Sequence, residues 1–192
     1  MFNDQTTPLT ALATRRSGKP RDLVAPGPDG DQLRQILEVA MRTPDHGKLA
    51  PWRFVIIDDR NAFADLLVTA FRAERPYLRD ADLAPIKQFA HQAPVLVVAL
   101  SSPIVDGPIP LWEQELSAGA ACMNLLHAAH ALGFAGGWLT GWAAYSDIVR
   151  DALGTVPERI AGFLFLGTPS QSLSERPRPE PAQAVRHWPE TR

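Results

Sequence analysis

The sequence predicts a single domain in which amphipathic helices cover a sheet of short apolar strands. Apolar residues recur at helical spacing around residues 33–41 and 63–71, and unbroken apolar runs occupy residues 95–100 and 160–166. Such runs are typical of strands that helices bury on both faces. The chain of 192 residues, 45% hydrophobic and 21% charged, is long enough for a core of its own. The alternation of helices and strands would by itself favour a parallel sheet.

Composition and charge exclude several classes of function. The formal net charge of -2 and the absence of a basic stripe with interleaved aromatic residues argue against nucleic-acid binding. Cys122 is the single cysteine, which excludes an intramolecular disulfide framework and fits a reducing compartment. No apolar run reaches membrane-spanning length, and the first residues lack the pattern of a secretion signal. We therefore expect a cytoplasmic protein that binds neither nucleic acid nor membrane.

The first predicted helix ends in a dense basic cluster. Thr7 is suited to the N-cap and Pro8 to the first helical position, and the helix should end near Arg15 or Arg16. Residues 15–21 then supply three arginines, a lysine and a serine. Cations at a helix C-terminus can simply offset the helix dipole. The number of donors exceeds that need and indicates a receptor for phosphate and for polar edges of a ligand.

A polar loop follows the second predicted helix. Asp29 and Gln32 have the spacing of a capping box at its start, and Pro44 disfavours helical geometry at Thr43. The loop at residues 42–48 contains Arg, Asp, His and Lys and leads into a predicted strand at residues 54–57. Polar residues between a core helix and a buried strand indicate either a functional site or a solvated connection.

The longest predicted helix spans residues 111–132 and should end at Gly133. Before it, prolines break residues 74–93 into at most a discontinuous helix that could cover the site. The middle of the helix at residues 111–132 consists of small residues, at positions 117–122, which allow another helix or a second subunit to approach closely. His127 and His130 share one face, but two histidines without a third ligand favour packing or an interface over a metal site.

The stretch at residues 133–142 contains four glycines and two tryptophans. Such a stretch indicates backbone close to a flat ligand or tight packing between layers. It does not have the order G-x-G-x-x-G, so a Rossmann site is not predicted. Ser146 should cap a short helix that extends to Leu153. Residues 170–192 are proline-rich and predict an extended arm or partly disordered tail, which leaves residues 1–169 as the domain.

Six motifs in a fixed order carry a resemblance to a known family. They are Arg15-Arg16-Ser17, MRTPDH at 41–46, PWRFV at 51–55, WEQELSAG at 112–119, GGW at 136–138 and GFLFLGTP at 162–169. In this order the chain resembles the flavin-dependent nitroreductase family from about residue 9 to residue 169. It is most similar to the short, minimal branch that lacks large inserted helices.

The resemblance implies an α+β fold with a central, mostly antiparallel sheet flanked by helices. It also implies an intertwined homodimer that binds FMN at the subunit interface and uses NADH or NADPH as reductant. The matched FMN-binding positions are Arg15, Arg16, Ser17, Arg42, His46, Trp138, Leu139 and Thr140, with His46 reaching the flavin from the opposite subunit. The positions matched to nicotinamide-cofactor contacts are Ala128, Ala129, His130, Ala131, Leu132 and Gly133.

Lys19 occupies the position of a basic residue that lies near the pyrimidine edge of the flavin in this family. A fixed cation there would stabilise the negative charge of the reduced flavin. The chain departs from the family at Ala50, where many members have Gln. It also lacks a matched basic motif near the C-terminus, so Arg178 and Arg186 are not assigned and Arg42 is the expected substitute for that charge.

The implied reaction is hydride transfer from NAD(P)H to FMN, followed by reduction of a nitroaromatic, quinone or related small-molecule acceptor in a ping-pong mechanism. An alternative is a non-catalytic FMN-binding or sensory protein. A metal-dependent hydrolase built on Asp45 and His46 is a third hypothesis, which a single Asp-His pair supports weakly.

Overall fold

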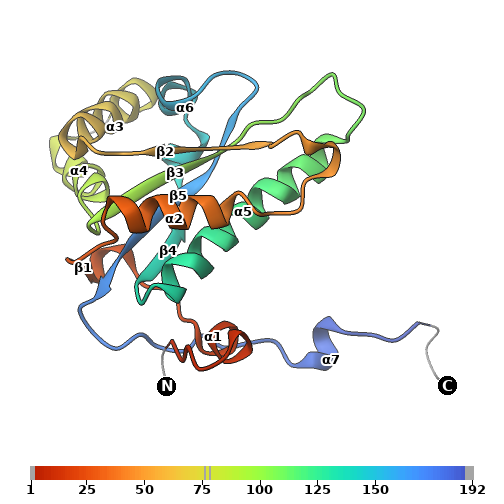
Figure 1. Ribbon diagram of the computed structural model, residues 1–192. Helices are drawn as coiled ribbons and strands as arrows, with labels where there is room; N and C mark the ends of the chain where they lie inside the picture. Colours follow the sequence, from red (N-terminus) through yellow and green to blue (C-terminus); the bar gives the residue numbers. More distant parts are fainter. Residues whose placement is uncertain (1–2, 76, 78, 189–192) are drawn as a thin grey trace.

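The computed structural model describes residues 3–75, 77 and 79–188 (Figure 1). Its strands are β1 (Leu23–Val24), β2 (Trp52–Ile56), β3 (Val95–Ser101), β4 (Ala135–Leu139) and β5 (Arg159–Pro169). Its α-helices are α1 (Pro8–Thr14), α2 (Gly30–Ala40), α3 (Arg60–Glu74), α4 (Ala84–Ala90), α5 (Leu111–Ala131), α6 (Asp147–Leu153) and α7 (Pro181–Ala184). Short 3-10 turns occur at Pro20–Asp22, His46–Lys48, Asp80–Leu83 and Trp142–Tyr145.

The five described strands form one sheet in which every pairing is antiparallel. The order is β1-β5-β3-β2, and β4 also pairs with β5. The expectation of antiparallel order is confirmed, and the parallel order that simple alternation favours is wrong. Two helices that pack on each other, α3 and α4, join β2 to β3, so the chain returns to the end of the sheet that it left. A strand placed next to its predecessor then runs in the opposite direction.

Helices cover both faces of the sheet (Figure 1). Alternate residues of β3 point to opposite faces: Leu96 and Val98 pack with α3, α4 and α6, whereas Val97 and Ala99 pack with α2 and α5. The burial of both faces that we predicted holds for β3 and β5. It is wrong for β2, an edge strand in which Trp52 is buried and Ile56 is 40% exposed, because an apolar run does not reveal which strand lies at the edge.

Several predicted element boundaries are confirmed. Thr7 and Asp29 form capping boxes at the starts of α1 and α2, and Ser146 caps α6. The helix α5 ends at Ala131 and is followed by Gly133 with a φ of 90°. Residues 80–90 form a 3-10 turn and the short helix α4, as expected for a discontinuous helix.

The glycine-rich stretch contains a strand that the sequence analysis did not predict. Residues 135–139 form β4, which pairs with β5 along its whole length. Gly136 lies so close to α5 that a Cβ atom there would be 2.6 Å from Leu126 Cδ2. Glycine therefore serves close packing here, although it weakens the strand signal in a sequence.

The C-terminal segment leaves the body of the domain beside α1 and extends away from it, with α7 as its single described helix (Figure 1). The division into a domain at residues 1–169 and an arm or tail at residues 170–192 stays a prediction, and residues 189–192 lie outside the described residues. None of the helices in the described part of the chain combines the length and apolar character needed to cross a membrane.

Candidate functional site

The basic loop after α1 is attached to the sheet at β4. The backbone N–H of Gly18 donates a 2.9 Å hydrogen bond to the carbonyl oxygen of Gly136. The neighbouring Gly137 lies against the carbonyl oxygen of Gly18, where a Cβ atom would be only 2.5 Å away. The glycines of β4 therefore let the loop that carries Arg15, Ser17 and Lys19 lie directly on the edge of the sheet.

This loop forms one wall of a pocket of about 270 Å³. The pocket combines cationic and hydroxyl groups with apolar side chains from α5 and β4. It is lined by Arg15, Ser17, Gly18, Lys19, Pro20, Met123, Leu126, Gly137, Trp138, Leu139 and Arg176. Such a lining can hold a flat aromatic ring against the apolar wall and an anionic group against the cations. Of the residues expected to bind a cofactor, the fold brings together Arg15, Ser17, Lys19, Trp138 and Leu139.

The residues that line this pocket include three cations, Arg15, Lys19 and Arg176, and no carboxylate. The Arg15 guanidinium is half-buried, and its Nη1 donates a 3.4 Å hydrogen bond to Ser17 Oγ. Its Nε is buried and has no hydrogen-bond partner within the described residues. Burial lowers the pKa of Arg15, and the nearby cations Arg178 and Arg16 lower it further, while Glu175 acts in the opposite direction. An arginine remains charged nonetheless, so the site is suited to an anion.

Arg16 takes a different direction from Arg15. Its side chain forms an ion pair with Glu175 in the C-terminal segment and donates hydrogen bonds to the carbonyl oxygens of Ala13 and Arg15. It is therefore engaged with the protein itself and is not one of the residues that line the pocket.

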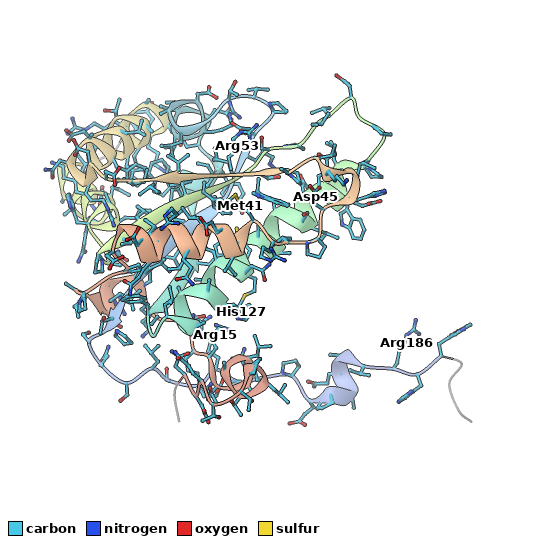
Figure 2. All side chains as sticks on the ribbon, viewed as in Figure 1. Arg15, Met41, Asp45, Arg53, His127 and Arg186 are labelled. Carbon is cyan, nitrogen blue, oxygen red and sulfur yellow. The ribbon has the colours of Figure 1, made fainter. Side chains whose placement is uncertain are left out.

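Arg176 lines the pocket, although the sequence analysis did not assign it. It also faces an adjoining polar pocket whose walls include Ser17 and Lys19. Arg178, which was considered and left unassigned, forms an ion pair of 3.0 Å with Glu175. Figure 2 places Arg186 far out on the arm, away from Arg15. The cluster of arginines after the last strand was the available signal, but only the fold shows which one faces the pocket.

The three residues expected to line a flavin divide between two pockets. The Trp138 indole is held by a 3.0 Å hydrogen bond from Nε1 to the carbonyl oxygen of Ala161, and with Leu139 it lines the basic pocket. Thr140 instead lines an apolar cavity of about 240 Å³ between α3, α4 and the turn after β4, together with Phe89 and Trp142. Trp138 and Leu139 thus face the basic pocket, whereas Thr140 does not line it.

The polar loop at residues 42–48 is anchored to α5. The Asn124 amide donates a 2.8 Å hydrogen bond to Thr43 Oγ1, and the Ser117 hydroxyl donates a 2.6 Å bond to the carbonyl oxygen of Pro44. Asp45 Oδ2 accepts a 2.7 Å hydrogen bond from the backbone of Ala50. The small and polar residues of α5 thus hold this loop in place, and the Asp45 carboxylate serves the loop backbone.

His46 and Arg42 do not line the basic pocket within one chain. The exposed His46 ring contacts Glu113, with 2.7 Å between Nδ1 and Oε2. Glu113 precedes Met123 of the pocket by ten residues, which is about 15 Å along a helix. Figure 2 accordingly shows Asp45 near one end of α5 and Arg15 near the other. A second copy of the chain would be needed to bring His46 to this pocket.

Half of the segment matched to nicotinamide-cofactor contacts is buried. Ala128, Ala129 and His130 are buried, whereas Ala131 and Gly133 are exposed and Leu132 is half-buried. The His130 ring contacts the carbonyl oxygens of Leu126 and Arg16. The buried side chains have no free surface for a cofactor.

Cys122 is fully buried among the side chains of α2, α5 and the sheet. Burial raises the pKa of its thiol to about 12, so the reactive thiolate is not populated near neutral pH. Within the described ranges, no group of three or more His, Cys, Asp or Glu side chains is placed to hold a metal ion.

Comparisons with known proteins identify the family of the chain. Residues 12–168 match the model of the family described as the nitroreductase family. A protein of Escherichia coli K12 named "Putative NAD(P)H nitroreductase YdjA" is 37% identical over 169 residues, 86% of this chain and 90% of that protein. A "Putative NAD(P)H nitroreductase" of Haemophilus influenzae is 38% identical over 165 residues, 83% of this chain and 87% of that protein.

Solved structures share the fold at lower sequence identity. A nitroreductase-like family protein from Bacillus cereus has a TM-score of 0.77 at 19% identity, covering 96% of this chain and 97% of that one. A nitroreductase from Desulfovibrio desulfuricans, described as putative and solved in complex with FMN, has a TM-score of 0.72 at 24% identity, covering 96% and 99%. Together with the family match over residues 12–168, these findings show that the chain belongs to the nitroreductase family.

Proposed function

We propose that this member of the nitroreductase family binds FMN in the basic pocket, takes hydride from NADH or NADPH and reduces small nitroaromatic, quinone or related acceptors. The observation that carries the proposal is a single pocket in which two cations, Arg15 and Arg176, face an apolar wall formed by Trp138 and Leu139. FMN has the matching chemistry, an anionic phosphate and a flat ring. The names of the E. coli and H. influenzae relatives and the FMN complex of the D. desulfuricans protein support this choice.

Different residues of the pocket would bind different parts of the cofactor. Arg15 and Arg176 would bind the phosphate through charge-assisted hydrogen bonds, and Ser17 would add a hydroxyl donor. Trp138 and Leu139 would pack against the ring and exclude water from it. When bound, FMN supplies the redox chemistry in ping-pong order, so the protein needs no acid–base pair of its own. Lys19 would place a fixed positive charge beside the ring and stabilise its reduced form.

We further propose that two copies of the chain form the working unit. Trp112 and Leu116 are 68% and 54% exposed on α5, and single chains rarely leave large apolar side chains of this kind grouped on one helix. A second copy packed against this face would cover them and could bring the loop with His46 and Arg42 toward the basic pocket.

The proposed location is the cytoplasm, a reducing compartment rich in NAD(P)H. The free thiol of Cys122 supports this location.

The experiment that tests the proposal is anaerobic addition of NADH or NADPH to the protein loaded with FMN. Loss of the yellow flavin absorbance, followed by its return when a nitroaromatic or quinone is added, is the expected result. A protein that binds FMN but stays yellow with both nicotinamides would instead be a flavin-binding protein without this activity.

A further inference from the structure

His130 connects the longest helix to the loop that forms the cofactor pocket. It lies in the last turn of α5 and is 4% exposed. Its Nδ1 lies 2.6 Å from the carbonyl oxygen of Leu126, and its Nε2 lies 3.0 Å from the carbonyl oxygen of Arg16. The first contact stays within α5, whereas the second spans 114 residues of sequence and reaches the basic loop.

The Arg16 carbonyl lies at the point of the loop from which two pocket-lining side chains project. It belongs to the residue between Arg15 and Ser17, both of which line the pocket. Two residues later the loop is fixed from the other side by the hydrogen bond from Gly18 to Gly136. The loop is thus held between β4 and the His130 ring, and a shift of the Arg16 peptide would turn the side chains on either side of it.

His130 is itself held firmly. Its carbonyl oxygen accepts hydrogen bonds of 2.8 Å from the Asn3 amide and 2.7 Å from the Gln5 amide. These bonds join the segment before α1 to the end of α5. The ring therefore projects from a fixed backbone, which suits a residue that sets the position of another segment.

We propose that His130 is a positioning residue of the FMN site: as a neutral imidazole it donates its single N–H, on Nε2, to the Arg16 carbonyl and thereby directs Arg15 and Ser17 into the pocket. This inference rests on the proposed function. It differs from the nicotinamide contact that the family resemblance implies for the same position, because the buried ring has no surface for a cofactor.

The two contacts of the ring can be tested separately, because the amide nitrogen of glutamine can take the place of Nε2 and that of asparagine the place of Nδ1. His130→Gln should retain the hydrogen bond to Arg16, and His130→Asn should retain only the contact with Leu126. Each substitution removes one of the two contacts from the same buried site, so each is a control for the other. A general loss of stability would affect both variants alike.

The measurements are the dissociation constant of FMN for flavin-stripped protein, the Tm, and hydrogen exchange at the amides of residues 15–18. We expect His130→Asn to weaken FMN binding roughly 3- to 10-fold, the worth of one hydrogen bond, and to speed exchange in the loop. His130→Gln should stay within about threefold of the wild type, although both variants lower the Tm by similar amounts. His127→Gln, on the same face of α5 but only half-buried, should leave exchange in the loop unchanged.

Equal FMN affinities in both His130 variants, or losses that follow the Tm alone, would overturn the inference. Unchanged loop exchange in His130→Asn would also overturn it, and this readout needs no flavin. Wild-type protein that binds no FMN would instead contradict the proposed function, and with it the role of His130 in that site.

Discussion

Gly137 lies directly against the carbonyl oxygen of Gly18, with no room for a side chain between β4 and the basic loop. The contact, together with the hydrogen bond from Gly18 to Gly136, sets the distance between the cations of the loop and the apolar wall of the pocket. The geometry of the candidate site therefore depends on a glycine that performs no chemistry.

Replacement of Gly137 by alanine should weaken FMN binding. The new Cβ would lie 2.5 Å from the Gly18 oxygen, so the backbone of the loop would have to move. Titration of flavin-stripped protein with FMN measures the effect. Gly30→Ala is the matched control, since a Cβ at that position meets nothing within 4 Å. Equal affinities of the two variants would show that the close contact is not needed.

Removal of an arginine that lines the pocket, Arg15 or Arg176, should weaken FMN binding more than removal of Arg186 at the far end of the arm (Figure 2). Arg15→Ala should cost roughly 10-fold or more in affinity, because a charge-assisted hydrogen bond is worth about 1.5–3 kcal/mol. Arg176→Ala should also weaken binding, whereas Arg186→Ala should not, since Arg186 lies far out on the arm. A loss in Arg186→Ala as large as in Arg15→Ala would be evidence against this pocket.

Introducing a charge on the exposed face of α5 should weaken dimerisation. Leu116→Glu would place a carboxylate where the second copy is proposed to pack, and a buried unpaired charge is costly. Sedimentation or light scattering over a range of concentrations gives the dissociation constant of the dimer. Val185→Glu, at an exposed apolar position on the arm, is the control. A wild-type protein that is a monomer and still holds flavin would contradict the proposed assembly.

The stability of the fold should decrease in mild acid because of His130. Burial, and then the charge of Arg15, lower the pKa of His130 below its ordinary 6.5, although its two carbonyl contacts act in the opposite direction. Burial lowers the pKa of the neighbouring His127 as well. The unfolded chain therefore binds more protons than the folded one as the pH falls below 6.5, and the free energy of unfolding falls with it.

Urea unfolding at about pH 7.5 and about pH 5.5 brackets the ordinary pKa of histidine. His130→Gln should lose less stability between these two pH values than the wild type does, since it cannot take up that proton. A pH dependence identical in the two proteins would show that His130 is not responsible.

The sequence predicted the elements that local patterns determine. The apolar runs located β3 and β5, and the spacing of apolar residues and caps located α2, α5 and α6. Strand order was not accessible, because the residues of a strand do not state which neighbour it pairs with. The strand β4 was missed for a different reason: its glycines serve close contacts with Leu126 and Gly18, which exist only in the folded chain.

In the candidate site too, the sequence identified residues that stand close together in the chain but not those that only the fold brings together. Arg15, Ser17 and Lys19 could be selected because they stand together in the sequence, and the fold places all three at one pocket. Arg176 could not be selected from the sequence, because it reaches the pocket from a segment without a recognisable pattern. The contact between His130 and Arg16 joins residues 114 positions apart and likewise required the structure.

The most direct test of the account is the visible absorbance spectrum of the purified protein before and after incubation with FMN and removal of the excess. We predict a yellow protein that retains one FMN per chain and releases it on denaturation. A colourless protein that takes up no added FMN would contradict the assignment of the basic pocket and the function proposed for it.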